Sequence, residues 1–156
     1  NDSVEGVDKH NVTGDATNPA APPPTVPYAG IADFDYVGRM ASTLSTFVKI
    51  DGQPVATVAS KSSLLPGEDS APTGRHAGPM GANFVPPTPV PLSLTLSITD
   101  AVGEGKPSAG AGSTFVRIDG TAILLDSDKL DTCDGLSIPM NSTVTAQKQQ
   151  FVACST

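Results

Sequence analysis

The sequence predicts an all-β protein built from short strands and hairpins, with little helix. Three observations lead to this prediction: a segment that occurs twice, runs in which apolar and polar residues alternate, and an abundance of turn residues. The chain has 156 residues, among them fifteen glycines, fifteen prolines and no tryptophan, a composition typical of many turns and short strands. The duplication indicates a repeated structural unit, since self-similarity is the sequence signature of repeated architecture.

The duplicated segment reads STFVKIDG at residues 45–52 and STFVRIDG at residues 113–120. In each copy Thr, Val and Ile fall on alternate positions, which is the period of a pleated strand with one buried face. Asp-Gly closes each copy, and these two residues tolerate the positive φ angles of a tight hairpin turn. Each copy is therefore predicted to form a hairpin.

Further strands are predicted where apolar residues alternate with polar ones. Residues 31–40 form one such run, residues 92–98 alternate strictly, and a final strand is expected around Val144. Residues 60–81 contain repeated Pro and Gly and predict a long irregular loop. Residues 103–112 are rich in glycine and predict a flexible connection.

The domain organisation follows from a change of composition near residue 30. Residues 1–30 are polar and then rich in proline, which favours an extended, solvated arm. Residues 31–156 are expected to form one folded domain. The formal net charge of −7 argues against nucleic acid as a partner, and no apolar run has the length of a membrane-spanning helix.

No catalytic motif is present in the sequence, so we expect a protein that is not an enzyme. There is no nucleophile elbow and no glycine-rich phosphate loop. The acidic residues between 126 and 134 lack the terminal Glu and the glycine placement of a calcium-binding EF-hand loop. They are interpreted as solvated turn carboxylates.

Two histidines and two cysteines are the whole set of soft metal ligands: His10, His76, Cys133 and Cys154. A structural zinc site uses four such ligands. His76 and Cys133 each follow one copy of the duplicated segment. Two alternatives remain open at this point, a Cys133–Cys154 disulfide and reduced, buried thiols.

Residues 113–135 contain TFVRIDGTA, then Asp128-Lys129, then CDG, and this series resembles the PAAR family and its PAAR-like relatives. Residues 45–60 match the first half of the same pattern. The resemblance implies a small cone of β-hairpins that caps the spike of a contractile injection system, such as a type VI secretion system or a phage tail-like particle. The chain departs from the family in having two histidines and two cysteines, where the family uses three histidines and one cysteine.

The resemblance also implies a set of partners. It implies a trimeric VgrG-like spike protein bound by one copy of the cap, with the two hairpins and residues 92–98 as three related units facing the threefold end. It implies an apex that contacts the target membrane, assembly in the bacterial cytoplasm, and a final place at the tip of an extracellular or secreted particle. It also implies a structural zinc near the apex, with His76 and Cys133 as ligands completed by Cys154 and His10. The alternative functional hypothesis is a secreted β module that recognises a glycan or receptor.

Overall fold

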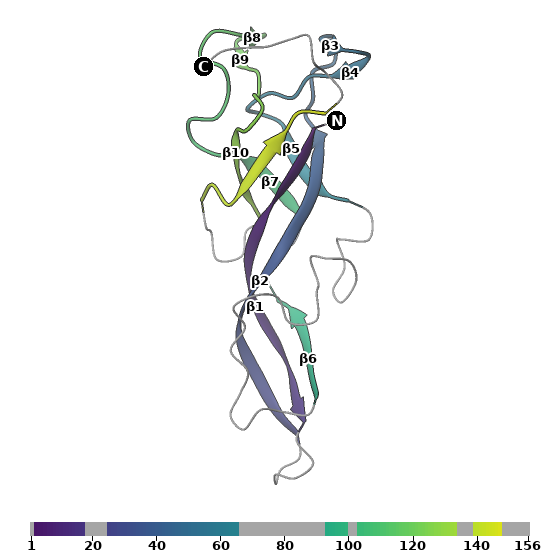
Figure 1. The fold of residues 1–156 in the computed structure, drawn as a ribbon, viewed down its shortest axis with the longest axis vertical. Coiled ribbons are helices and arrows are strands. Elements are labelled where there is room, and N and C mark those ends of the chain that lie inside the picture. Colours follow the sequence, from purple (N-terminus) through teal and green to yellow (C-terminus); the bar gives the residue numbers. More distant parts are fainter. Residues whose placement is uncertain (1, 18–24, 66–92, 100–102, 134–138, 148–156) are drawn as a thin grey trace.

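The computed structural model describes residues 2–17, 25–65, 93–99, 103–133 and 139–147, and these form eleven strands and no helix (Figure 1). The predicted all-β architecture is confirmed.

Six of these strands close into a barrel in which every neighbouring pair is antiparallel. Around the barrel they follow the order of the chain, and the last strand pairs again with the first. The six are β1 (Ser3–Thr17), β2 (Thr25–Ser42), β5 (Lys61–Leu64), β7 (Glu104–Pro107), β10 (Lys129–Thr132) and β11 (Ser142–Thr145).

Strands β1 and β2 are much longer than the barrel and continue beyond it as a ribbon. Residues 3–6 of β1 pair with β11, whereas residues 12–17 pair with a further strand, β6 (Ser93–Ile98). Strand β2 accompanies β1 along the whole of this length. The molecule is therefore elongated, with the barrel at its broad end and the β1–β2–β6 ribbon at its narrow end (Figure 1).

The prediction of a solvated arm over residues 1–30 is wrong for the described part of that segment. Residues 3–17 and 25–30 are paired strand residues, and β1 is central to the sheet. The inward face of β1 carries buried Val4, Asp8, His10 and Val12. Because two of these four side chains are polar, the sequence lacks the apolar alternation that marks a strand.

The predicted hairpins are confirmed in both copies of the duplicated segment. The first is β3 (Lys49–Ile50) with β4 (Gln53–Pro54), and the second is β8 (Arg117–Ile118) with β9 (Thr121–Ala122). At the turns, Asp51 and Asp119 both have φ of 48°, and the following glycines have φ of 74° and 77°. The two copies, identical at seven of eight positions, therefore build the same turn twice.

Each hairpin is inserted between two barrel strands, β2 and β5 in the first half of the chain and β7 and β10 in the second. The hairpins lie at the broad end of the molecule (Figure 1). An antiparallel bridge between Thr57 and Ile123 joins the two halves, and Leu124 N donates to Ala56 O at 3.0 Å. The unit expected as a third equivalent differs, since β6 pairs with β1 in the ribbon rather than forming a described hairpin of its own. The connection expected over residues 103–112 contains strand β7.

The barrel interior is filled mainly by aliphatic side chains around Tyr36. The cluster comprises Val4, Tyr36, Met40, Ala56, Leu64, Leu124, Leu130, Cys133 and Val144. The Tyr36 hydroxyl lies 2.9 Å from the Ser62 hydroxyl and 3.2 Å from the Gly103 carbonyl oxygen. Burial raises the pKa of Tyr36 above its ordinary value, and the protonated hydroxyl donates to the Gly103 carbonyl oxygen.

Candidate metal centre

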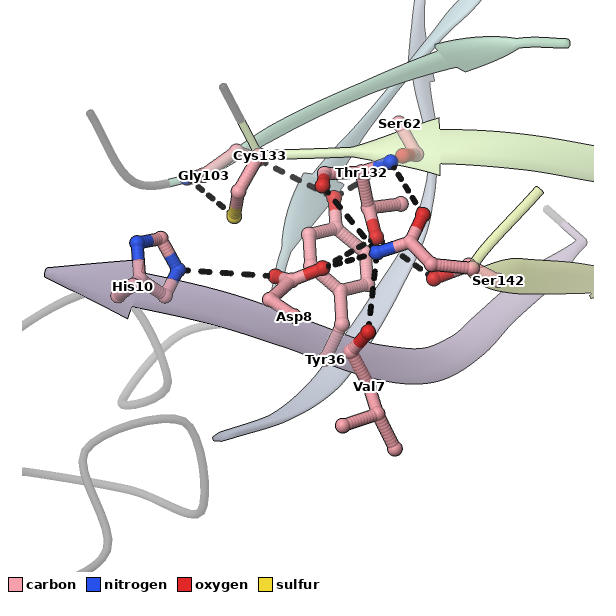
Figure 2. A network of polar contacts seen from close by, with 10 residues as sticks. Val7, Asp8, His10, Tyr36, Ser62, Gly103, Thr132, Cys133 and Ser142 are labelled. Atoms are coloured by element: carbon pink, nitrogen blue, oxygen red, sulfur yellow. Dashed lines mark hydrogen bonds and ion pairs between the residues drawn. The ribbon is translucent and has the colours of Figure 1, made fainter. Parts of the chain in front are cut away.

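Two of the sequence-predicted ligands, His10 and Cys133, meet in the interior together with Asp8 (Figure 2). Asp8 and His10 lie on β1, and Cys133 directly follows β10. One ligand atom from each residue lies within 4.8 Å of the other two. All three residues are buried, with exposed fractions of 1%, 0% and 8%. The described residues therefore contain a group that can hold a metal ion.

The alternation of β1 places Asp8 and His10 on the same face of the strand. Side chains two residues apart point to the same side, and the two neighbours Val7 and Lys9 face outward. His10 Nε2 lies 3.9 Å from Asp8 Oδ2. The edge of the His10 ring packs against Phe34, with the ring centroids 5.9 Å apart. The imidazole is thus held by packing in an orientation that faces the carboxylate.

Hydrogen bonds to one oxygen orient the Asp8 carboxylate. Asp8 Oδ1 accepts from Thr132 Oγ1 at 2.5 Å and from Asn141 Nδ2 at 2.7 Å. The other oxygen, Oδ2, faces His10. The carboxylate therefore presents one fixed oxygen to its supporting residues and the other to the cluster.

Cys133 reaches the cluster through an unusual backbone conformation. Its φ of 51° lies in the left-handed region, which costs a residue with a side chain about 1–2 kcal/mol. Cys133 N donates to Glu104 O at 2.8 Å, and Gly103 N donates to Cys133 Sγ at 3.4 Å. In Figure 2 the sulfur lies near the His10 ring and the Asp8 carboxylate. Residues in this region of φ and ψ cluster at functional sites, where the surrounding structure imposes the strain.

The cluster lies at one end of the barrel seam, the place where β11 joins β10 to β1 and closes the barrel. Strand β11 lies between β1 and β10 and begins at Ser142. Just before it, the Asn141 side chain donates to Val7 O at 3.0 Å and accepts from Thr132 N at 2.9 Å. The side-chain amide of Asn141 thus bridges β1 and β10 at Val7 and Thr132. The cluster joins the same two strands at the next residues, Asp8 and Cys133.

The structure brings together only part of the predicted ligand set. His76 and Cys154 lie outside the described residues, so their ligation and the alternative Cys133–Cys154 disulfide stay predictions. The expected position near an apex does not hold for His10, which lies between the β11-paired and β6-paired parts of β1. Asp8 was missed by the sequence analysis. The signal that was available is its spacing of two residues from His10.

The three donors define the class of ion that the cluster can bind. A thiolate, an imidazole and a carboxylate suit zinc and related first-row divalent ions. Mg²⁺ and Ca²⁺ prefer oxygen ligands alone. The three described donors leave one position of a tetrahedron for a further ligand.

Comparison with known proteins finds no relative of this chain. The chain matches no family model, no curated protein sequence and no solved structure. In the part of the chain that the structure describes, no helix has the length and apolar character needed to cross a bilayer. The residues and geometry of the chain itself are therefore the basis for assigning a function.

Proposed function

We propose that this protein is a structural, non-enzymatic tip of the PAAR-like kind, which caps a trimeric VgrG-like spike in a contractile injection system. The observation that carries the proposal is the pair of matching hairpins at the broad end of the molecule (Figure 1). They are built by the segments whose sequence resembles the PAAR pattern. One copy would cap each trimer.

The hairpins present the two most exposed large hydrophobic side chains of the described residues. Phe47 is 69% exposed and Phe115 is 76% exposed, and they occupy the same position in the two copies. Lys49 and Arg117, two residues further along, are also exposed. Aromatic residues and Arg are enriched at the energetic centres of protein interfaces. The Thr57–Ile123 bridge fixes the two hairpins relative to each other, so the pair can act as one binding surface.

The narrow end of the molecule supports an orientation in which the hairpins at the broad end face the spike. The ribbon of β1, β2 and β6 narrows away from the barrel, and we propose that this end faces the target membrane (Figure 1). The assembled protein would lie at the tip of a particle that is built in the bacterial cytoplasm and acts outside it. We also propose that the metal is zinc with a structural role, because thiolate and imidazole ligands suit it and zinc itself carries no redox chemistry.

The test is reconstitution of the full chain with a trimeric spike protein, with the mass of the complex measured in solution. We expect one copy per trimer. Phe47→Ser combined with Phe115→Ser should weaken binding by at least tenfold. The matched control is Ile31→Ser, which removes a 45% exposed apolar side chain from the ribbon and should leave binding unchanged.

Three copies per trimer, or the absence of spike binding, would contradict the proposal. Specific binding to glycans without binding to the spike would instead favour a secreted adhesion module.

A further inference from the structure

We propose that Asp8 Oδ2, His10 Nε2 and Cys133 Sγ bind one zinc-class divalent cation that joins β1 to the end of β10. This assigns a carboxylate from the first strand as a metal ligand and places the ion at the open end of the barrel seam. The inference depends on the side-chain geometry of the cluster and stands independently of the proposed spike-tip function.

Geometry is the first argument. The donor atoms come from segments more than a hundred residues apart, yet they lie within 4.8 Å of one another. Ligands of a tetrahedral zinc ion lie about 2.0–2.3 Å from the metal, so neighbouring donors are separated by less than 4 Å. Separations of at most 4.8 Å therefore require only small side-chain movements. Asp8 Oδ2 and His10 Nε2, at 3.9 Å, need to approach each other by only about 0.5 Å to share a tetrahedral cation.

Charge is the second argument. A buried thiolate beside a buried carboxylate would place two negative charges in an interior that solvates them poorly. A divalent cation neutralises both, while His10 supplies a neutral nitrogen. On binding, the Cys133 thiol loses its proton to solvent and a metal–sulfur bond replaces the S–H bond. No electron transfer is involved.

The surroundings are the third argument, because metal ligands are oriented by further hydrogen bonds. Thr132 and Asn141 hold Asp8 Oδ1 and leave Oδ2 directed at the cluster. The Gly103 N–H donates to Cys133 Sγ at 3.4 Å, and this contact helps to orient the sulfur. The left-handed φ of Cys133 is a local cost that a metal–sulfur bond can offset.

The consequence is a crosslink across the seam. Asn141 ties β1 to β10 by hydrogen bonds at the start of β11, and the ion ties the same strands beyond this point. The ribbon leaves the barrel there. Metal binding would therefore fix the direction of the ribbon relative to the barrel, and its free energy would add to the stability of the closed form.

The experiment uses cobalt as the probe. The full-length chain is purified under reducing conditions, stripped with a chelator, and titrated with Co²⁺ while the absorption spectrum is recorded. We expect one equivalent to bind, with a thiolate-to-cobalt charge-transfer band and intense visible bands of a tetrahedral ion. Zn²⁺ should then displace the cobalt and remove both signals. A wild-type protein that shows no charge-transfer band, as a purely hydrogen-bonded polar cluster would, overturns the proposal without the need for any variant.

Variants assign the ligands. Asp8→Asn keeps an oxygen for Thr132 and Asn141 but replaces the facing oxygen, and it should weaken Co²⁺ binding by at least about 100-fold. His10→Gln should do the same, and Cys133→Ser should abolish the charge-transfer band. Thr132→Val removes only a supporting hydrogen bond and should weaken binding by about 10–100-fold.

The matched control is Asp51→Asn, at a turn position that Asn tolerates, and it should bind cobalt like the wild type. Retention of the charge-transfer band by Cys133→Ser, or unchanged affinity in Asp8→Asn and His10→Gln, would overturn the assignment.

Discussion

The two halves of the chain share one backbone pattern and differ in the chemistry placed at its end. Strand β5 is followed by Leu65, and strand β10, at the corresponding position after the duplicated segment, is followed by Cys133. Both residues donate their backbone N–H to a carbonyl of the preceding barrel strand, Leu65 to Val37 at 3.0 Å and Cys133 to Glu104 at 2.8 Å. The hydrogen-bonding frame is similar, but only the second half brings a thiol to the candidate metal centre.

A second pair of corresponding residues shows the same contrast between a shared hydrogen bond and different side-chain chemistry. The Ser60 hydroxyl accepts from Thr57 N at 2.9 Å, and the Asp128 carboxylate accepts from Leu125 N at 2.6 Å. A hydroxyl in one half and a carboxylate in the other thus close the same turn. The backbone geometry fixes which hydrogen bond the side chain makes at such a position. The charge and reactivity of that side chain can differ between the two halves.

The largest expected effect separates the two halves by metal dependence. Cys133→Ser should remove the stabilisation by zinc, whereas Leu65→Ser, the matched change in the first half, should keep it. At a free zinc concentration a thousand times the dissociation constant, this stabilisation is about 4 kcal/mol. Urea unfolding with zinc and with a chelator measures it for the wild type and both variants. An equal response to zinc in Cys133→Ser would contradict the account.

The second effect concerns the packing between the halves. A Cβ on Gly105 would lie 2.4 Å from Ser62 Oγ in the first half and 2.6 Å from Thr132 Cγ2 in the second. Gly105→Ala should therefore lower the free energy of unfolding by about 1–3 kcal/mol, the usual cost of overpacking. Urea unfolding checks this, with Ser63→Ala as a control expected to change stability by less than about 0.5 kcal/mol. An unaffected Gly105→Ala variant would mean that the two halves pack less closely than described.

The third effect is pH-dependent and belongs to the second half alone. The hydrogen bond from the Ser108 hydroxyl is the main cause that lowers the pKa of Asp131 from its ordinary 3.8, and the Met140 N–H and Lys106 act in the same direction. A lowered folded-state pKa gives stability that is complete above the unfolded value and is lost as the pH falls through the folded value.

Asp131→Asn should therefore cost about 1 kcal/mol near neutral pH and much less in strong acid. Urea unfolding across a series of pH values measures the difference. The corresponding first-half change, Ser63→Ala, should show no such dependence on pH. A cost for Asp131→Asn that is constant from neutral to acid pH would argue against this role of the carboxylate.

The smallest effect tests the equality of the hairpins. Gly52 and Gly120 have φ of 74° and 77°, and a Cβ on either would meet nothing within 4 Å. Substitution by Ala should therefore cost only the strain of the left-handed backbone, about 1 kcal/mol, and the two costs should be equal. Thermal unfolding of the single variants compares them. Clearly unequal costs would show that the duplicated sequence sits in two different environments.

The sequence predicts those elements whose signals are local. The hairpins at residues 45–54 and 113–122 follow from alternation and an Asp-Gly turn, and β6 follows from strict alternation. Strand β7 could not be found in this way, because Glu-Gly-Lys-Pro has no apolar pattern and becomes a strand by pairing with β5 and β10. Strand β1 was not predicted for a related reason, because the inward-facing Asp8 and His10 interrupt its apolar pattern.

The candidate metal centre was predictable only in part. His10 was found because the chain has few soft ligands, whereas Cys133 was also selected by its place after the second copy of the duplicated segment. Asp8 is one of sixteen acidic residues, and its spacing of two residues from His10 is a weak local signal. What makes it a ligand candidate is its burial beside Thr132 and Asn141, contacts between opposite ends of the chain that depend on closure of the barrel.

The most direct test of the central claim is zinc X-ray absorption spectroscopy on the full-length protein purified without chelators and loaded with one equivalent of zinc. The account predicts a tightly bound ion with a sulfur at about 2.3 Å and nitrogen and oxygen ligands at about 2.0–2.2 Å. The Cys133→Ser variant should lose the sulfur contribution, and Leu65→Ser should keep it. A zinc ion with only nitrogen and oxygen ligands in the wild type, or a sulfur contribution that survives Cys133→Ser, would contradict the account.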